Sequence, residues 1–516
     1  MLKVGLEFVL KVLQTIGSTW PCRSLTAGFK VCILAGVLGS IPSPSLAQTD
    51  NALDLDRFCR LSPSDVERKK TLREAASTSM QAAQAYQTFL QAHSQRMRTC
   101  RQQNWPQQQA IWLRLYPCDV NPDRLSQILD QVVDAGYNQV FVEVFYDGRV
   151  LLPSAENPTP WPSVINEPGY ETVDLLEQSI DLGRARGLQV YAWLFTLNFG
   201  YSYSNRSDRG EVLARNGRNL TSLDLLQGEV QAFIDPYHPT AQADYTQLIQ
   251  LVRQRRPDGI LFDYVRYPRG TGTASVAGQV QDLMIYGAAA QTALINRAQN
   301  NKGRTLIEQF VQKGFITVND IEQVNKRYPQ EGEPLWQGRQ VPPPPKPNAE
   351  PIPLEQQQAR LQQELWLLSV AHAQRGVLDF LQMGVNLAQQ ANVPSGAVFF
   401  PGGNQTVGQS GYDARLQPWD QFPAYITWHP MVYAACGRTD CILDEIRRVV
   451  NQAKPGTLIQ PALAGMWGQS SAERPSLDQQ MEAIQRSFPG LQAVSHFAYS
   501  WQYPQMDQER KFCRLP

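Results

Sequence analysis

Two acidic residues stand inside apolar stretches of the 516-residue sequence. Asp263 lies in GILFDYVRYP (259–268), and Glu143 lies in QVFVEVFYDG (139–148). A charge removed from water destabilises a fold unless it is paired or used. Two carboxylates on either side of a glycosidic bond can hydrolyse it, one as the acid and the other as the base or nucleophile. We therefore expect Asp263 to act as nucleophile or base and Glu143 as the acid, with a pKa raised by apolar neighbours.

Glu143 also has an interpretation that involves no catalysis. Arg114 lies in the preceding apolar stretch, AIWLRLYP (110–117), and can form a buried ion pair with Glu143. A buried carboxylate that is paired in this way needs no further role. Both interpretations of Glu143 stay open on the sequence alone.

Aromatic and hydrogen-bonding side chains stand late in the same kind of stretch. Sugar rings present flat C–H faces that pack on aromatic rings, and their hydroxyl groups need polar partners. Core packing explains about half of these aromatic residues equally well, and His429 can instead be a satisfied core histidine. The expected substrate-binding residues are Arg266, Tyr267, Trp193, His429, Tyr433, Trp467 and Trp501.

Eight short apolar stretches alternate with helical patterns from about residue 108 onward, which predicts parallel strands with crossover helices and an α/β fold. Eight such units favour a closed (β/α)8 TIM barrel, whose sites lie at the carboxyl ends of its strands. An open doubly wound sheet is disfavoured because no glycine-rich loop follows the first strand. The stretches are 110–117, 139–148, 188–200, 259–268, 396–403, 424–433, 457–467 and 493–504.

Further segments surround the predicted barrel. We expect an N-terminal helical extension (48–105), a first half of the barrel (106–270), a helical and proline-rich insertion (271–353), and a second half of the barrel (354–516). The insertion is expected to cover the barrel mouth as a lid or docking piece. Its proline-rich part, which includes VPPPPKP, is either an extended tether or a disordered loop.

The N-terminus has the features of a signal peptide. Basic residues precede the apolar stretch VCILAGVLGSI, and the small-x-small pattern Ser45-Leu46-Ala47 follows. We expect a signal peptide over residues 1–47, export to the periplasm or cell exterior, and no membrane span after cleavage, because no apolar run approaches 20 residues.

Six cysteines remain after the predicted cleavage, and an even number in an exported chain permits disulfides. The helical pattern over 64–98 contains no Gly or Pro, and one helix of that length holds its ends roughly 50 Å apart. Direct pairing of Cys59 with Cys100 is therefore not expected. The expected pairs are Cys59–Cys513, Cys100–Cys118 and Cys436–Cys441, with free buried thiols as the alternative.

Composition excludes several classes of function. The formal net charge is zero, whereas a nucleic-acid binder usually has a basic excess, so no nucleic-acid partner is expected. No CxxC pair or HxxxH spacing occurs, so we expect no metal site and no cofactor. A polysaccharide deacetylase is a weaker alternative, because the histidine ligands for its metal are missing.

Several motifs resemble a known family. GILFDYVRYP preceded by PD, together with AFIDPYHP, VYAWLF and VFVEVFYDGRVLLPS, is similar to the glycosyl hydrolase-like family ten barrels (the DUF187 group) over about residues 110–268. The resemblance implies an exported (β/α)8 barrel that hydrolyses glycan chains, some relatives being associated with the cell wall. Asp263 and Arg266 match the motif positions. The sequence departs from the family where Tyr191 replaces a frequent His and Glu143 a frequent Gln.

The sequence thus predicts an exported enzyme, a glycoside hydrolase that acts on a polysaccharide or cell-wall glycan chain by carboxylate acid/base catalysis. The alternative is a catalytically silent barrel that binds glycan and docks on the cell wall. The absence of an acidic residue late in the last four apolar stretches favours this alternative, which needs the aromatic residues but no second carboxylate.

Overall fold

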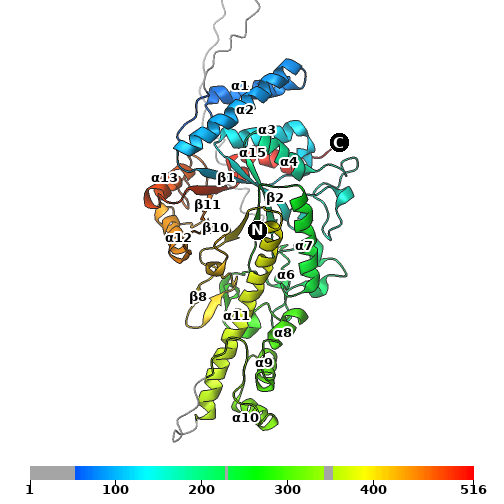
Figure 1. The fold of residues 1–516 in the computed structure, drawn as a ribbon, viewed down its shortest axis with the longest axis vertical. Coiled ribbons are helices and arrows are strands. Elements are labelled where there is room, and N and C mark those ends of the chain that lie inside the picture. Colours follow the sequence, from blue (N-terminus) through cyan, green and yellow to red (C-terminus); the bar gives the residue numbers. More distant parts are fainter. Residues whose placement is uncertain (1–52, 227–229, 342–351, 516) are drawn as a thin grey trace, which may run out of the picture. The chain divides into compact units, whose positions relative to one another are not determined.

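The computed structural model describes residues 53–226, 230–341 and 352–515, which belong to one compact unit (Figure 1). The predicted signal peptide, residues 1–47, lies outside the described residues, as does most of the proline-rich stretch. Within these ranges, no helix has both the length and the apolar content that crossing a membrane requires.

Eight parallel strands form the closed barrel. They hydrogen-bond in the order β1-β12-β11-β10-β7-β5-β4-β2, and pairing of β1 with β2 completes the circle. The predicted (β/α)8 barrel is therefore confirmed, and each of the eight apolar stretches contributes one strand. The strands are β1 (Gln108–Leu113), β2 (Gln139–Tyr146), β4 (Gln189–Phe195), β5 (Gly259–Asp263), β7 (Ser395–Phe399), β10 (Thr427–Val432), β11 (Ala462–Ala464) and β12 (Ala493–Phe497). Tyr146 of β2 also pairs with Arg149 of the two-residue antiparallel strand β3 (Arg149–Val150).

Helices surround the barrel, and three of them, α3, α4 and α7, begin at a residue whose side chain caps the helix. The side chain of Asn121 accepts hydrogen bonds from the backbone of Asp123 and Arg124, and Pro122 opens the helix. His238 caps the helix that Pro239 opens in the same way. The surrounding helices are α3 (Pro122–Asp134), α4 (Leu175–Ala185), α7 (Pro239–Gln254), α11 (Leu354–Gln389), α12 (Thr439–Gln452), α13 (Leu477–Ser487), α14 (Tyr499–Gln502) and α15 (Pro504–Phe512).

Side chains fill the interior of the barrel. The Phe141 ring meets the rings of Tyr191 and His429 edge-on, at centroid distances of 5.7 and 5.4 Å. Nearer the amino ends of the strands, the Gln460 amide donates to the side chain of Gln139 at 2.9 Å. The interior is thus a packed core, and a ligand can enter only at a mouth.

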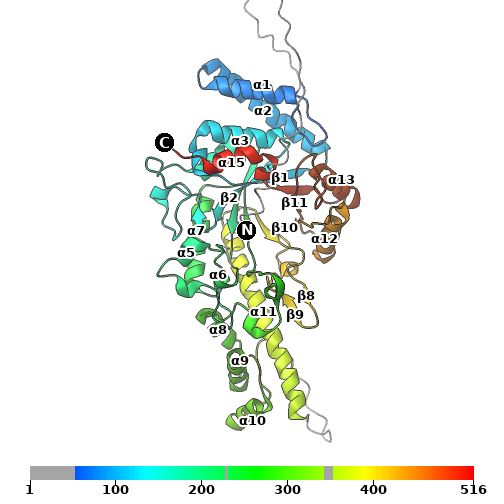
Figure 2. The same cartoon turned by 180° about the vertical axis from the view of Figure 1, so that it is seen from behind.

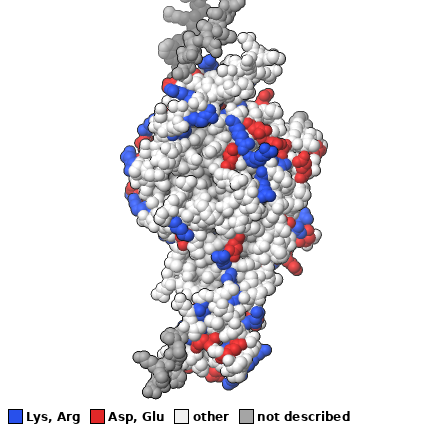
Figure 3. Space-filling view, viewed as in Figure 1, with Lys and Arg blue, Asp and Glu red and all other residues white. Residues whose placement is uncertain are grey.

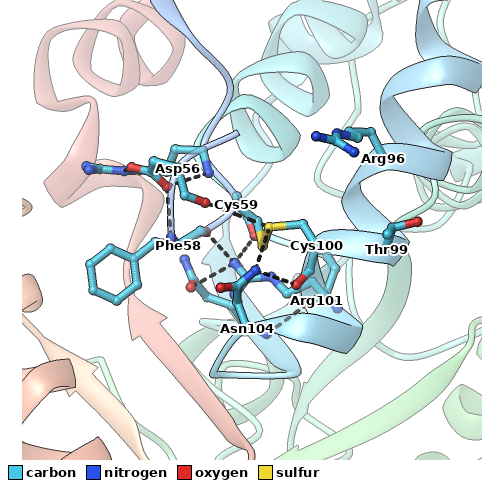
Figure 4. Close-up of a disulfide and its surroundings, with 12 residues drawn as sticks. Asp56, Phe58, Cys59, Arg96, Thr99, Cys100, Arg101 and Asn104 are labelled. Atoms are coloured by element: carbon cyan, nitrogen blue, oxygen red, sulfur yellow. Dashed lines mark hydrogen bonds and ion pairs between the residues drawn. A yellow bond between two sulfur atoms is a disulfide. The ribbon is translucent and has the colours of Figure 1, made fainter. Parts of the chain in front are cut away.

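The N-terminal extension folds back on itself, and two of the predicted disulfides are wrong for that reason. The chain turns at residues 77–79, so that α1 (Pro63–Ala76) and α2 (Met80–Gln103) pack side by side (Figure 1). Cys59 therefore reaches Cys100, with their Cα atoms 5.8 Å apart (Figure 4). The predicted single helix would have kept them apart.

Two further disulfides join the other four cysteines of the described residues. Cys118, just after β1, joins Cys513 at the end of α15. The predicted Cys436–Cys441 bond is confirmed. Beside the Cys59–Cys100 bond, the Arg101 guanidinium donates to the carbonyl oxygen of Phe58 at 2.8 Å (Figure 4). The same guanidinium donates to the side chain of Gln109 in β1 at 2.9 Å. The extension is thus held to itself by a covalent bond and to the barrel by a hydrogen bond.

A buried charge network joins the extension to α3 and α4. Its centre is Asp130 of α3, which is 1% exposed. Asp130 accepts hydrogen bonds from Arg73 at 2.9 Å, Arg186 at 3.0 Å and the hydroxyl of Tyr86 at 2.8 Å, and Lys69 lies 3.6 Å away. These cations hold the pKa of Asp130 below its usual value, although burial alone would raise it.

The chain between β5 and α11 forms an inserted subregion. Helices α9 (Asn301–Lys313) and α10 (Val318–Arg327) lie beside the N-terminal half of α11 in both views (Figures 1 and 2). A small sheet of β6 (Val276–Ala277), β9 (Gly411–Asp413) and β8 (Thr406–Val407) connects the insertion to the loop after β7. Its expected role as a lid or docking piece stays a prediction. Short helices complete the described fold: α5 (Tyr201–Ser204), α6 (Ser222–Leu225) and α8 (Ala288–Ile295).

Charges of both signs share the surface. On the face drawn in Figure 3, basic and acidic side chains lie next to one another, and wide uncharged areas separate these groups. This arrangement fits the zero formal net charge of the chain. That face offers no broad basic field of the kind that attracts nucleic acid.

Candidate active site

The carboxyl ends of neighbouring strands bring predicted site residues together. Glu143 of β2 pairs in register with Trp193 of β4, and Phe195 of β4 pairs with Asp263, the last residue of β5. Phe262 points outward to α11, where Gly384 leaves room for its ring; a β-carbon there would lie 2.8 Å from it. Since side chains alternate along a strand, Asp263 faces the barrel interior.

Asp263 is held by neutral donors. The indole Nε1 of Trp193 donates to its Oδ2 at 3.1 Å, and the backbone N–H of Tyr264 donates to its Oδ1 at 2.6 Å. The side chain is 7% exposed. Burial raises the pKa of Asp263, while these hydrogen bonds and the nearby charge of Arg266 oppose the shift. The carboxylate is therefore positioned and partly desolvated, as a base or nucleophile requires.

The backbone after Asp263 adopts an unusual conformation. Tyr264 has a φ of +52°, in the left-handed region that bulky residues avoid. The turn places its ring against that of Phe195, 4.2 Å between centroids, and under the guanidinium of Arg266, 4.6 Å from the ring centre. Strain of this kind persists where surrounding contacts fix the chain. Here those contacts fix the turn between Asp263, which accepts from the Tyr264 backbone, and Arg266, which lies over the Tyr264 ring.

Glu143 forms the buried ion pair with Arg114 that was one of its two interpretations from the sequence. Arg114 donates to both carboxylate oxygens of Glu143, at 3.1 Å from Nη2 to Oε1 and by a second bond from Nε to Oε2. Glu143 is 1% exposed. Burial raises its pKa, and Arg114 opposes that rise. Arg114 also stacks on the ring of Tyr146, so the guanidinium is fixed in place.

A cavity of about 280 Å³ opens beside this pair. Glu143, Arg114 and Trp193 line it together with aromatic rings of the neighbouring strands. The indole of Trp112 stands edge-on to that of Trp193 at 4.7 Å, and Phe497 lies 5.8 Å from Trp112. We call this space the mouth cavity. Its remaining lining residues come from the C-terminal part of the chain and the end of β1: Tyr116, Ala498, Ser500, Asp507 and Lys511.

Two further predicted residues belong to β10 or follow it, His429 buried in the barrel and Tyr433 partly buried beyond the strand end. His429 is 1% exposed, and neither of its ring nitrogens has a hydrogen-bond partner among the described residues. Burial lowers its pKa to about 3, which keeps the ring neutral. Tyr433 follows β10 with its ring 5.8 Å from Phe497, and its hydroxyl likewise has no partner within the described part of the chain.

The remaining predicted aromatic residues lie apart from the mouth cavity lining. Tyr267 is fully buried. Trp467 packs against Phe58 of the extension, 5.3 Å between ring centroids, and against His496. Trp501 is 36% exposed and lies 6.4 Å from the Phe497 ring. Of these three, Trp501 is the one whose surroundings allow contact with a ligand at the mouth.

Arg266 lines a second and larger cavity, of about 620 Å³. Arg269, Arg415 and Phe400 line it as well. We call this space the arginine cavity. Its two other arginines were not among the predicted site residues, since Arg415 lies in the irregular loop after β7. A signal was nevertheless present, because Arg269 follows directly after the YVRYP motif.

Within the described residues, no three histidine, cysteine, aspartate or glutamate side chains are grouped so as to hold a metal ion.

The family comparison agrees with the motifs. Residues 99–320 match the family model described as Glycosyl hydrolase-like 10. The matched segment contains β1, β2, β4 and β5, and with them Glu143, Trp193, Asp263 and Arg266. No curated protein matches the sequence.

Solved structures resemble the chain at low identity. A hypothetical protein from Ruminiclostridium thermocellum is 17% identical with a TM-score of 0.25, over 31% of this chain and 78% of that one. The tandem GH20 catalytic modules of the pneumococcal exo-β-D-N-acetylglucosaminidase StrH are 10% identical with a TM-score of 0.38, over 78% and 80%. The GH20 β-N-acetylhexosaminidase from Streptomyces coelicolor A3(2) is 9% identical with a TM-score of 0.39, over 78% and 60%.

Proposed function

Starting from the match of residues 99–320 to the glycosyl hydrolase-like model, we propose that the protein is an exported glycoside hydrolase. Its substrate is a polysaccharide or cell-wall glycan chain, bound at the carboxyl ends of the barrel strands. The three disulfides suit an oxidising compartment, which supports the exported part of this proposal.

The observation that carries the proposal is the environment of Asp263. It is a buried carboxylate at the end of a barrel strand, and two neutral donors orient it without neutralising it. In our mechanism Asp263 acts as the base or nucleophile at the sugar carbon. The hydrogen bonds from Trp193 and the Tyr264 backbone stabilise its ionised form during that step.

Glu143 is the proposed second carboxylate. Its burial favours the protonated form that a general acid needs, whereas the bonds from Arg114 favour the ionised form. Proton donation to the leaving oxygen therefore requires that the Arg114 contact loosen when substrate enters the mouth cavity. The aromatic residues Trp112, Trp193 and Trp501 supply surfaces for the sugar rings.

A catalytically silent, glycan-binding barrel is the second candidate. The ion pair between Arg114 and Glu143 favours it, because a carboxylate engaged on both oxygens is a poor proton donor. In this case the mouth would bind glycan through the same aromatic residues and release no product.

Sugar release tests the proposal. Purified protein from residue 48 onward is incubated with peptidoglycan and a panel of polysaccharides, and reducing ends are counted beside Asp263→Asn. We expect release by the native protein and a loss of about 10²–10⁴-fold in the variant, the range typical of a lost acid/base group. Circular dichroism establishes that the variant is folded, and Asp181→Asn, an exposed carboxylate on α4, is the matched control.

The outcomes separate the two candidates. Equal release by native protein and Asp263→Asn removes Asp263 from the mechanism. Binding of a glycan without release by either protein moves the function to the glycan-binding barrel. Where release occurs, the anomer of the first product assigns retention or inversion.

A further inference from the structure

The arginine cavity has a one-sided charge. It measures about 620 Å³, and among the nine described residues that line it, three are arginines and none is acidic. The mouth cavity differs, because Glu143 and Asp507 balance Arg114 and Lys511 there. A hollow lined by several guanidinium groups and no carboxylate attracts anions.

Arg266 is held in this cavity without a carboxylate partner among the described residues. Its guanidinium lies over the ring of Tyr264, at 4.6 Å, and close to those of Phe233 and Phe400, at 5.6 and 5.5 Å. Its one hydrogen bond to the described chain goes to the carbonyl oxygen of Tyr267, at 3.1 Å. Aromatic rings fix a guanidinium in place and leave its remaining N–H groups available to a ligand.

The other two arginines share one counterion. Asp413 accepts two hydrogen bonds from the guanidinium of Arg415, at 2.7 and 2.8 Å, and one from that of Arg269 at 3.2 Å. One carboxylate thus faces two guanidinium groups, and Arg266 adds a third. The cavity therefore keeps an excess of positive charge together with a rigid arrangement of its donors.

The cavity lies next to the proposed catalytic carboxylate. Arg266 and Asp263 are only three residues apart in the chain, and the charge of Asp263 acts on the guanidinium of Arg266. A second hollow, of about 310 Å³, shares Leu225, Leu226 and Gly270 with the arginine cavity and extends it. Together they offer room for more than one sugar unit, and Arg266, which lines the larger hollow, follows Asp263 by three positions in the chain.

We propose that the arginine cavity binds the carboxylate of an acidic sugar, so that the substrate is an anionic glycan with a carboxylate-bearing unit beside the bond at Asp263. This inference rests on the proposed function and narrows its substrate class. A planar carboxylate matches the fork of donors that a guanidinium presents, and the Phe400 ring provides an apolar surface for the sugar face. A neutral glycan would leave the excess charge without a partner.

Binding to defined probes tests the inference apart from catalysis. Calorimetry on the native protein compares oligogalacturonate, its methyl ester, a neutral oligosaccharide of equal length and inorganic sulfate. We expect binding of the free acid, and a dissociation constant raised about tenfold in Arg266→Gln, which loses charge-assisted hydrogen bonds. Arg447→Gln, an exposed arginine of α12 that pairs with Asp444, is the matched control.

A second substitution leaves every arginine in place. Thr271 is exposed at the rim of the cavity, so Thr271→Glu adds a competing carboxylate without disturbing the core. We expect it to weaken oligogalacturonate binding more than the neutral Thr271→Gln does. This comparison keeps the test valid if Arg266→Gln fails to fold.

The outcomes distinguish this inference from the proposed function. Acid-specific binding that depends on Arg266, without sugar release, upholds the cavity assignment and removes the hydrolase. Sugar release from neutral glycans, with a KM that is unchanged in Arg266→Gln, supports the hydrolase and overturns the cavity assignment. Equal binding of acid, ester and neutral chains overturns the inference, and so does binding of sulfate alone or of no probe.

Discussion

The join between the N-terminal helices and the barrel, and the barrel mouth, both bury carboxylates but surround them differently. At the join, Asp130 is bonded to two arginines and a tyrosine, with a lysine close by. At the mouth, Asp263 receives its hydrogen bonds from neutral donors among the described residues, the Trp193 indole and the Tyr264 backbone. The pKa is accordingly lowered at Asp130 and raised at Asp263.

The difference separates a structural carboxylate from a candidate catalytic one. A charge that several cations surround stabilises the fold only while it stays ionised. A charge that neutral dipoles hold keeps the capacity to accept a proton or attack a sugar. The same burial therefore serves packing at one site and reactivity at the other.

Neutralising the structural carboxylate should have the largest effect on stability. We expect Asp130→Asn to lower the free energy of unfolding by about 3–5 kcal/mol, because it leaves Arg73 and Arg186 without the carboxylate to which they donate. Lys69 keeps Asp134 as its second partner. Urea unfolding measures this, with Asp181→Asn as the control. A loss as small as that of the control would mean that the network adds no stability.

Neutralising the mouth carboxylate should have a smaller effect, with the opposite sign. Since the folded-state pKa of Asp263 is raised above its ordinary 3.8, its ionisation lowers stability as pH rises from that value through the folded-state pKa. Asp263→Asn lacks this loss, so we expect it to be more stable than the native protein at pH 7. The advantage should vanish below about pH 4. If Asp263→Asn is less stable than the native protein by the same amount at pH 7 and below about pH 4, this expectation is contradicted.

Removing one neutral donor should have the smallest effect. Trp193→Phe deletes the N–H group that stabilises the Asp263 carboxylate, so the pKa of that carboxyl rises further. Provided that sugar release is observed, the acid limb of its pH–rate profile should move up by roughly 0.5–1 pH unit. Trp501→Phe, which changes no bond to Asp263, should leave the limb in place. If the acid limbs of the pH–rate profiles are identical in the native protein and Trp193→Phe, the hydrogen bond from Trp193 does not change the pKa of Asp263.

The barrel could be predicted because its signals are local. Each strand is an apolar stretch, and helices with capping residues such as Asn121 and His238 separate them. The path of the extension could not be predicted in the same way. Ser77 ends one helix and Ser79 begins the next, and no Gly or Pro marks the turn between them. In the sequence this turn therefore looks like the interior of one long helix, although it is what brings Cys59 next to Cys100.

The parts of the site that could be predicted are the side chains whose direction follows from alternation along a strand. Asp263 and Glu143 face inward by alternation, and Arg114 was recognised as a partner for Glu143. The positions of other residues depend on contacts distant in sequence. Trp467 packs against Phe58 of the extension, and Arg415 and Arg269 meet at Asp413, in a loop that has no periodicity.

The two long-range disulfides also determine how the protein would respond to mechanical force. The bond between Cys118 and Cys513 closes most of the barrel into one covalent ring, and the bond between Cys59 and Cys100 closes the helical extension. Tension applied across both rings can therefore lengthen only the span 101–117 between them. That span contains β1, the strand that lies between β12 and β2. In the oxidised protein, pulling would draw this single strand out of the barrel while the other seven stay tethered.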